Sequence, residues 1–422
     1  MSAMPTPSFA CVSDPARRRS LGVLLGSAAS ALAPGVARAQ APASAASAAR
    51  ARRRVAVATV PQLLGAIDKA HEDGGGVALV LADGEYRLDR SVSITVPGVS
   101  IVSASGRAAS VRIGGDAMNP DARVQNLIRV SGADFELHGV TLERAGRHLL
   151  QIAGESAAAR PVLRDCVFRD AWEQLVKVSR DPAQPEMFCD DGRLERCRFE
   201  YTAGIGPQFY IGGLDAHGAR RWVIRENYFR NIASPGRHVA EHAIHLWSDS
   251  SDVLVERNTI VDCDRGIGFG LGDARPVRGG TIRNNFIHHR DNGHPYADVG
   301  IVIEGSTGVD VLHNTVLQEH PYPRAIEVRF ATTREVRVLN NLVSKAIVVK
   351  DGATASVAGN VTSLDRSLLR LSVAGDLRLA ESVAGVVDRA LPEGAVPDDI
   401  DGTPRPRDGK ADVGAHEWRA RR

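Results

Sequence analysis

Four residues on two similar stretches of the chain have side chains suited to proton transfer and sugar binding. Asp215 and His217 lie two residues apart in GGLDAHGARR, and His245 and Trp247 lie two residues apart in HAIHLW. An imidazole with a pKa of about 6.5 exchanges protons near neutral pH, and a neighbouring carboxylate orients its ring or raises its pKa. An indole offers a flat apolar face to a sugar ring. These residues can act together only if the fold places the two stretches side by side.

A short pattern recurs along most of the chain and explains why the two stretches look alike. A small or amide residue stands before an apolar end roughly every 20 to 30 residues. The recurring positions are Val140, Cys166, Cys197, Asn227, Asn258, Asn285, Asn314, Asn341 and Asn360. Each unit is too short to bury its own apolar residues, so neighbouring units must stack and share one core. The spacing predicts a parallel β-helix with stacked asparagines in its turns.

The two ends of this repeat support the same fold. In TVPQLLGAIDKAHEDGGG, Thr59 is a candidate N-cap, and Leu63, Leu64, Ile67 and Ala70 share one face of a helix that ends at Gly74. The chain resembles the right-handed parallel β-helix proteins of the pectin-lyase-like superfamily. The resemblance rests on this helix, the segment LADGEYRL after it, the asparagine-marked coils, and the final segments DGTPRP and DVGAHE. We therefore expect an all-β, single-stranded right-handed parallel β-helix with an N-terminal capping helix that covers its open end.

Alternation along the strands predicts which residues face outward. Leu214, Ile244 and their equivalents are apolar in six successive coils, so they point into the core. The first outward column is Asp215, His245, Gly268, Val302, Glu327 and Val348. The second outward column is His217, Trp247, Gly270, Glu304, Arg329 and Lys350. Asp215, His217, His245 and Trp247 are therefore expected to meet on one solvent-facing surface.

This mixture of side chains predicts a groove for an extended polymer, although an ordinary charged surface remains the simpler alternative. Gly268 and Gly270 offer a bare floor, with Glu304 and Glu327 beyond it. His217 is the candidate base and His245 the candidate second base or acid. Arg265 and Arg329 are candidates to neutralise a substrate carboxylate, with Trp247 stacking on a sugar ring. The direction of His242 is not set by the pattern.

Proton abstraction suits a glycan that contains uronic acid. Removing the C5 proton beside the carboxylate leads either to β-elimination by a lyase or to epimerisation. GLDAHGARRWVIREN resembles the Asp-Pro-His-Asp segment of mannuronan C5-epimerases, with Asp215 and His217 at its first Asp and its His. Ala216 and Gly218 depart from it. A lyase of an acidic polysaccharide is the first hypothesis, and an epimerase or a non-catalytic carbohydrate-binding or cell-surface β-helix are its alternatives.

Other chemistries find less support. Glycoside hydrolysis needs paired carboxylates flanking the bond, and Asp190-Asp191 lies in an inter-coil loop. No cofactor and no metal ligand is assigned; calcium stays open as an alternative that no cluster of carboxylates supports. Four cysteines follow residue 39: Cys166, Cys189, Cys197 and Cys263. Cys166 and Cys197 occupy the asparagine column, which favours small stacked residues over a disulfide.

The chain as a whole reads as an exported monomer. Arg17-Arg18-Arg19, an apolar run and Ala37-Arg38-Ala39 make residues 1–39 a twin-arginine-like export signal. We expect a basic linker at 40–54, a cap with first coils at 55–125, β-helix coils at 126–363 and a C-terminal coil and tail at 364–422. A net charge of +2 does not indicate nucleic acid, and no later segment could anchor in a membrane. The expected location is periplasmic or secreted, with an acidic polysaccharide as partner.

Overall fold

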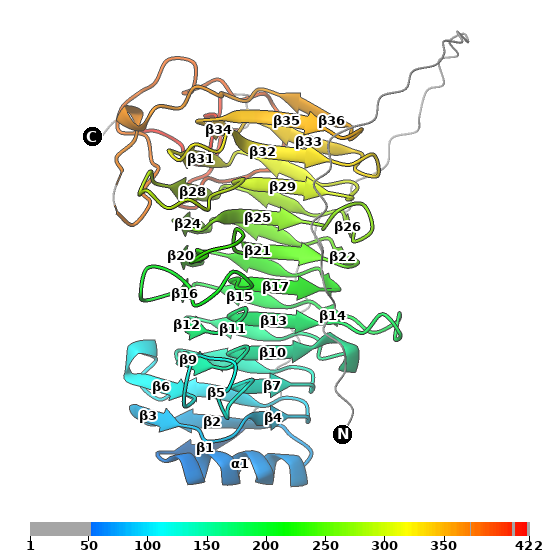
Figure 1. Cartoon of the computed structure of the whole chain (residues 1–422), viewed down its shortest axis with the longest axis vertical. Coiled ribbons are helices and arrows are strands. Elements are labelled where there is room, and N and C mark those ends of the chain that lie inside the picture. The colour runs from blue at the N-terminus through cyan, green and yellow to red at the C-terminus, as the bar shows by residue number, and fades with distance from the viewer. Residues whose placement is uncertain (1–51, 372, 407–409, 420–422) are drawn as a thin grey trace. The chain divides into compact units, whose positions relative to one another are not determined.

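A computed structural model describes residues 52–371, 373–406 and 410–419, which form one solenoid of stacked coils (Figure 1). The pairings between its strands are parallel, so the expected parallel β-helix is confirmed. The expected export signal and the first part of the linker lie outside the described residues. The first strand, β1, begins at Arg53, within the stretch expected to be linker, and pairs with β2 from Arg53 to Val57.

The N-terminal end of the solenoid is closed by the one α-helix among the described residues, α1 (Val60–Glu72). Thr59 caps it by accepting a hydrogen bond from the Gln62 amide at 3.3 Å, and Pro61 lies in the first turn. Leu63, Ile67 and Ala70 are buried against the first coils, as the spacing predicts. Short 3-10 turns lie at Ala108–Ser110, Gly154–Ser156 and Arg366–Leu368.

Each coil contributes strands to three long sheets and, in four coils, to a short one. Sheet 1 contains β1 (Arg53–Val57), β2 (Val77–Leu81), β5 (Ser100–Ser103), β8 (Glu136–His138), β11 (Val162–Arg164), β15 (Arg193–Glu195), β19 (Val223–Arg225), β23 (Leu254–Glu256), β27 (Thr281–Arg283), β30 (Asp310–Leu312), β33 (Val336–Leu339) and β36 (Ala355–Ala358). Sheet 2 contains β4 (Val92–Ile94), β7 (Ile128–Val130), β10 (Leu150–Ala153), β13 (Val176–Ser179), β17 (Leu214–His217), β21 (His242–Trp247), β25 (Arg265–Phe269), β29 (Ile301–Glu304), β32 (Arg324–Arg329) and β35 (Ala346–Lys350).

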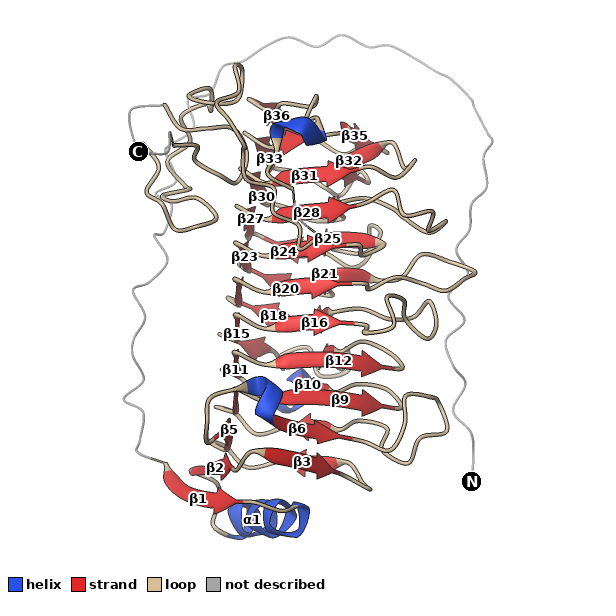
Figure 2. Cartoon of the chain, turned by 90° about the vertical axis from the view of Figure 1, so that its left-hand side faces the viewer, coloured by secondary structure: helices blue, strands red, loops and turns tan. Residues whose placement is uncertain are grey.

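The other two sheets complete the coils. Sheet 3 contains β3 (Gly84–Arg87), β6 (Val111–Gly114), β9 (Thr141–Ala145), β12 (Val167–Ala171), β16 (Arg198–Glu200), β20 (Tyr228–Arg230), β24 (Thr259–Val261), β28 (Phe286–His289), β31 (Thr315–Gln318) and β34 (Leu342–Val343). The short sheet contains β14 (Cys189–Asp190), β18 (Ala219–Arg220), β22 (Ser250–Ser251) and β26 (Val277–Arg278). Figure 2 shows the strands of sheet 3 side by side along the solenoid.

The turns between sheets 1 and 3 carry the expected asparagine ladder. The Asn227 side chain donates to Asn258 Oδ1 at 2.9 Å, and Asn258 donates to Asn285 Oδ1 at 3.0 Å. The residue before each ladder position is left-handed, for example Arg257 with φ +54°. Cys166 and Cys197 begin the ladder as buried free thiols, so stacking rather than a disulfide is confirmed for them.

The apolar core runs along the interior of the coils, and its side chains become partly exposed at the last coil of sheet 2. Phe168, Phe199 and Phe229 stack with ring centroids 4.9 and 4.5 Å apart. The inward positions of sheet 2 are buried up to Val328, but Val349 is 37% exposed because β35 is the edge strand of that sheet. Residues after 360 instead pack a second apolar cluster, including Leu377 and Leu379, onto Phe286 of β28.

Candidate functional site

The outer face of sheet 2 brings together the residues that the sequence pattern placed there. In the β17–β21 pair, Asp215 lies opposite His245 and His217 lies opposite Trp247. Gly268 is paired with His245 on one side and Val302 on the other, and Glu304 is paired with Arg329. The first predicted outward column is thus confirmed in register. The second column is confirmed on either side of Gly270, which follows the end of β25 and is not paired. The first column also extends one strand further back.

Lys177 is the residue that this extension adds. It lies on β13 and is paired directly with Asp215 in the parallel register. Its ammonium group forms an ion pair with the Asp215 carboxylate, and its Nζ lies 2.8 Å from His217 Nε2. The sequence interpretation missed it because its separation from Asp215 is 38 residues, longer than the usual coil. The alternation Val176-Lys177-Val178 was the signal that could have revealed it.

Asp215 is the anionic centre of the cluster. It is 3% exposed, and one of its oxygens accepts a hydrogen bond from the Trp247 indole N–H at 2.6 Å. Burial raises the pKa of its carboxyl, but the charge of the Lys177 ammonium group and its hydrogen bond outweigh burial and hold that pKa well below its usual value. Asp215 is therefore a carboxylate at neutral pH, where it holds both Lys177 and Trp247.

His217 lies at the edge of the cluster, with 17% of its side chain exposed. Its ring packs on the Trp247 ring at a centroid distance of 4.0 Å. Burial and the charge of Lys177 lower its pKa to about 3. Asp215 raises the pKa of His217 as expected, but burial and the charge of Lys177 outweigh it. The expectation that Asp215 orients the ring is corrected, because His217 Nε2 is 3.9 Å from Asp215 Oδ1, too far for a hydrogen bond.

His245 faces outward as expected but is covered. It is 2% exposed, and its Nε2 lies 3.0 Å from the Gly270 carbonyl oxygen. Its ring is parallel to that of Trp247, with centroids 5.3 Å apart. Since Trp247 and its neighbours cover this ring, His245 supports the site from beneath and does not meet solvent as His217 does.

The two glycines make room for neighbouring protein groups. A Cβ at Gly268 would lie 2.7 Å from the His242 ring, so Gly268 is the floor under that ring. A Cβ at Gly270, which has φ +84°, would lie 1.8 Å from the Glu304 carbonyl oxygen. The expected bare floor for a polymer is therefore occupied at Gly268 by His242.

The more distant charged residues are held by one another. Arg265 Nε bonds to Asp298 Oδ2 at 3.0 Å. Arg329 pairs with Glu304 at 3.2 Å, and Glu327 pairs with Lys350 at 2.8 Å. Arg329 lies on β32, which β21, β25 and β29 separate from His217. The structure thus does not bring Arg329, Glu304 and Glu327 together with the His217 cluster.

Two further residues border the cluster and were not identified from the sequence. The guanidinium of Arg275, an exposed residue, lies 5.7 Å from the Trp247 ring centroid, and no ion pair of Arg275 is found among the described residues. Tyr210 is 42% exposed, and burial together with the charges of Asp215 and Glu241 raises its pKa to about 12. A free cation therefore lies beside Trp247, and a phenol that keeps its proton lies within electrostatic reach of Asp215.

A model of the right-handed β-helix region family matches residues 128–363, more than half of the chain. The chain belongs to this right-handed β-helix family. The match confirms the handedness that the resemblance to pectin-lyase-like proteins implies. No match is found among curated protein sequences.

Solved structures of other β-helix proteins are similar in fold. The crystal structure of a pectate lyase, Pel9A, is 12% identical and has a TM-score of 0.56, with 87% of this chain and 97% of that chain covered. An alginate lyase from Paenibacillus sp. str. FPU-7 is 12% identical with a TM-score of 0.41, covering 65% of this chain and 97% of that chain. At 12% identity, the likeness to the pectate lyase Pel9A shows the fold alone.

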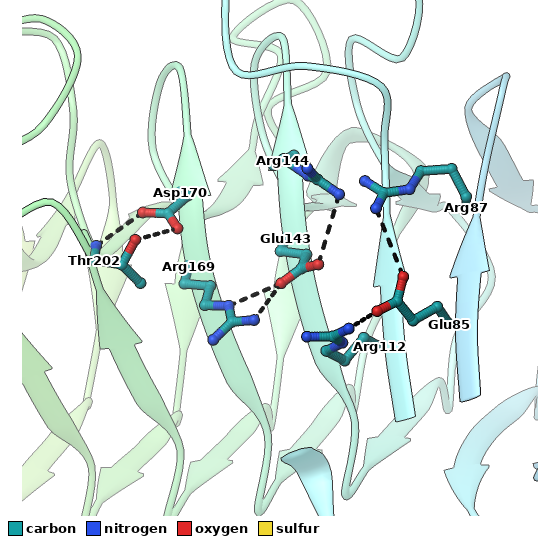
Figure 3. A pocket seen from close by; sticks show the side chains of 8 residues that line it. All are labelled: Glu85, Arg87, Arg112, Glu143, Arg144, Arg169, Asp170 and Thr202. Atoms are coloured by element: carbon teal, nitrogen blue, oxygen red, sulfur yellow. Dashed lines mark hydrogen bonds and ion pairs between the residues drawn. The ribbon is translucent and has the colours of Figure 1, made fainter. Parts of the chain in front are cut away.

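A hollow of about 460 Å³ lies on a different face of this β-helix protein, over the first strands of sheet 3 (Figure 3). Its walls are charged residues that pair with one another, such as Arg169 with Glu143 at 2.9 Å and Thr202 with Asp170 at 2.7 Å. Arg112 likewise pairs with Glu85 across β3 and β6. Because each arginine that lines it has a carboxylate within ion-pair distance, this hollow lacks the unpaired cation found beside Trp247.

Two groups of three side chains in the described chain bring possible metal ligands within 4.8 Å of one another. In one group, Asp399, Asp401 and His416 already have protein partners: Asp399 accepts the Thr403 amide, Asp401 pairs with Arg378, and His416 accepts the Leu379 amide. The other group, Glu241, His242 and His245, lies beside the Asp215 cluster, and neither ring nitrogen of His242 has a hydrogen-bond partner among the described residues.

Proposed function

We propose that this β-helix protein is a lyase that cleaves an acidic, uronic-acid-containing polysaccharide by β-elimination. The observation that carries the proposal is the contact between Lys177 and His217, which places an unprotonated imidazole beside an ammonium group at the edge of an outward-facing sheet. A uronate carboxylate needs a cation, and its C5 proton needs a base. Trp247 offers a ring face for a sugar, and Arg275 is a second cation beside it.

Binding of an acidic sugar would change the state of His217. Lys177 has three N–H donors, of which Asp215 and His217 take two. A substrate carboxylate that attracts the Lys177 ammonium releases Nε2 of His217 and offsets the positive charge that lowers its pKa. His217 then becomes a stronger base where the substrate is bound.

The proposed elimination begins with transfer of a proton from the sugar to the protein. The C5 proton passes to His217 Nε2, and the electron pair of the C5–H bond forms the double bond between C4 and C5. The C4–O bond breaks, and the leaving oxygen takes a proton from Tyr210, whose phenol remains protonated at neutral pH. If a proton instead returns to C5 from the opposite side, the same residues perform epimerisation, the alternative that the local Asp215 and His217 match suggests.

The first experiment is incubation with a panel of polyuronates and sulfated glycosaminoglycans, followed by ultraviolet absorbance of unsaturated products. We expect absorbance to rise with one substrate and to fall at least about 100-fold in rate in His217→Ala. His238→Ala is the matched control, since His238 is an exposed histidine of a neighbouring loop. A flat trace with C5 deuterium exchange would identify an epimerase, and binding without either reaction a carbohydrate-binding module.

We further propose that the protein acts after export, as a periplasmic or secreted monomer. The support is the arrangement of Arg17-Arg18-Arg19 and Ala37-Arg38-Ala39 around an apolar run. Among the described residues, no helix is long and apolar enough to cross a membrane. Fractionation of expressing cells, with Arg17 and Arg18 changed to Lys as the comparison, tests export directly.

A further inference from the structure

His242 is buried without a hydrogen bond at either ring nitrogen. It is 5% exposed, and neither Nδ1 nor Nε2 has a partner in the structure. Buried polar side chains are nearly always bonded, so this ring requires an explanation. A neutral imidazole has one nitrogen with a free lone pair, and no described residue forms a hydrogen bond with it here. A free lone pair on a fixed imidazole can coordinate a metal cation.

His245 adds a second lone pair at the same place. Its Nε2 lies 3.0 Å from the Gly270 carbonyl, which can only accept, so Nε2 carries the proton. In the neutral ring Nδ1 is therefore bare, and it faces Glu241 Oε2 at 3.8 Å and Asp215 Oδ1 at 3.9 Å. A lone pair opposite two carboxylates is repelled unless a positive charge lies between them.

The three side chains converge from one short segment of chain. The His242 and His245 rings have centroids 4.5 Å apart, and the ligand atoms of Glu241, His242 and His245 all lie within 4.8 Å of one another. The absence of a side chain at Gly268 is what lets the His242 ring lie on this face. The strand register, a glycine, the unpartnered His242 ring and the free Nδ1 of His245 thus produce a pre-arranged set of two nitrogens and one carboxylate.

We propose that Glu241, His242 and His245 bind a divalent transition-metal ion of the Zn²⁺ class. Two imidazoles and a carboxylate suit such ions, whereas Ca²⁺ takes six to eight oxygen ligands. The hydrogen bond from His245 to the Gly270 carbonyl is the outer contact that orients metal-binding histidines. Tetrahedral Zn²⁺ at about 2.1 Å separates its ligands by about 3.4 Å, so the group closes slightly on binding. Glu241, with 30% of its side chain exposed, has the freedom to move.

The Asp399, Asp401 and His416 group does not share these properties. Each of its members bonds to a backbone amide or an arginine, as described above, so its charges and lone pairs are already used. The proposal for Glu241, His242 and His245 stands independently of the lyase proposal, because it rests on unsatisfied ligands and not on turnover.

The test is calorimetric titration of ZnCl₂ into untagged, chelator-treated protein in a buffer that does not bind zinc. We expect one ion per chain, and a thermal unfolding temperature that rises with added Zn²⁺. Co²⁺ in its place should give a visible absorption band of a nitrogen-ligated ion. Absence of zinc binding by the wild-type chain would overturn the proposal.

Three variants separate ligation from folding. His242→Phe fills the same space without a nitrogen, so it should fold at least as well as the wild type and bind Zn²⁺ at least about 100-fold more weakly. Glu241→Gln should also weaken binding, whereas His238→Ala should bind as the wild type does. Unchanged zinc affinity in a folded His242→Phe variant would place the ion elsewhere and refute the assignment.

Discussion

Lys177 and His217, 40 residues apart in the chain, lie 2.8 Å apart at Nζ and Nε2 in the folded protein. The parallel register of β13 and β17 creates this contact, because it sets Lys177 opposite Asp215 with His217 two residues further along the same face. The contact decides the electrostatics of the site. It lowers the pKa of His217, keeps Lys177 near a position where a carboxylate can reach it, and ties both to a buried anion.

Lys177→Met should destabilise the protein and change the titration of His217. Asp215 would lose its cationic partner while remaining buried, which costs about 3–5 kcal/mol of unfolding free energy. The pKa of His217 should rise, since the charge of Lys177 is one cause of its depression. Chemical denaturation and NMR titration of the His217 ring measure the two effects. The Lys177→Met/Asp215→Asn double variant should regain part of the stability, and an unchanged His217 pKa would contradict the assigned cause.

Trp247→Phe separates the two roles of the indole. The phenyl ring retains a face for a sugar, but the hydrogen bond to Asp215 is lost, which should cost about 1.5–3 kcal/mol of stability. We expect glycan affinity to change less than about threefold in this variant and to fall more in Trp247→Ala. Equal affinities for the two variants would mean that the ring face does not bind sugar.

Stability should decrease as the pH falls below about 6.5, since several histidines are buried in the neutral form. Burial and the charge of Lys177 lower the pKa of His148 to about 4. Between about pH 6.5 and 4, His148 is protonated in the unfolded chain but not in the folded chain. The free energy of unfolding therefore decreases by up to about 1.4 kcal/mol per pH unit as the pH falls. Above pH 6.5 both states are neutral and the contribution is constant.

Urea denaturation at pH 7, 5.5 and 4.5 measures this effect. His148→Gln keeps a donor for the Gln174 carbonyl but does not titrate, so its stability should depend less on pH than that of the wild type. The curves should differ most below pH 5.5 and run parallel above pH 7. A pH dependence identical in the two proteins would show that other groups, His217 and His320 among them, carry the whole effect.

The pH below which activity falls should differ between kcat/KM, which reports on the free enzyme, and kcat, which reports on the substrate complex. If His217 is the base, its pKa of about 3 predicts that kcat/KM stays constant on the acid side down to about pH 4. Substrate binding beside Lys177 should raise that pKa, so kcat should fall at a higher pH than kcat/KM does. Initial rates across pH at saturating and at low substrate distinguish the two. Coincident acid limits would argue against release of His217 by substrate.

Asn258→Ala should weaken the coils around it. Asn258 Oδ1 accepts from both the backbone and side-chain nitrogens of Asn227, so its loss leaves two buried donors unsatisfied and should cost about 2–4 kcal/mol. Asn360→Ala is the matched control at the partly buried end of the ladder, where water can replace the lost acceptor. Thermal unfolding should rank Asn258→Ala below Asn360→Ala.

The repeat and the facing of its strands could be predicted from the sequence alone. Apolar residues at every second position in six successive coils admit only one inward face, and the amide column admits only one turn. These local regularities determined that Asp215 lies beside His245 and that His217 lies beside Trp247. They determined the register because a shift of one residue would expose the whole core.

Only the tertiary structure decided which charges meet and which rings are covered. The long connection after β13 hid Lys177 from the repeat, and its pairing with Asp215 changed the expected state of His217. The His242 ring lies on the outer face because Gly268 on the next strand leaves space there. Such contacts depend on the three-dimensional fit of side chains from separate coils. A periodic pattern determines the face on which a residue lies. The distances to its neighbours and its burial in the folded protein determine which partner it contacts and whether its side chain is protonated.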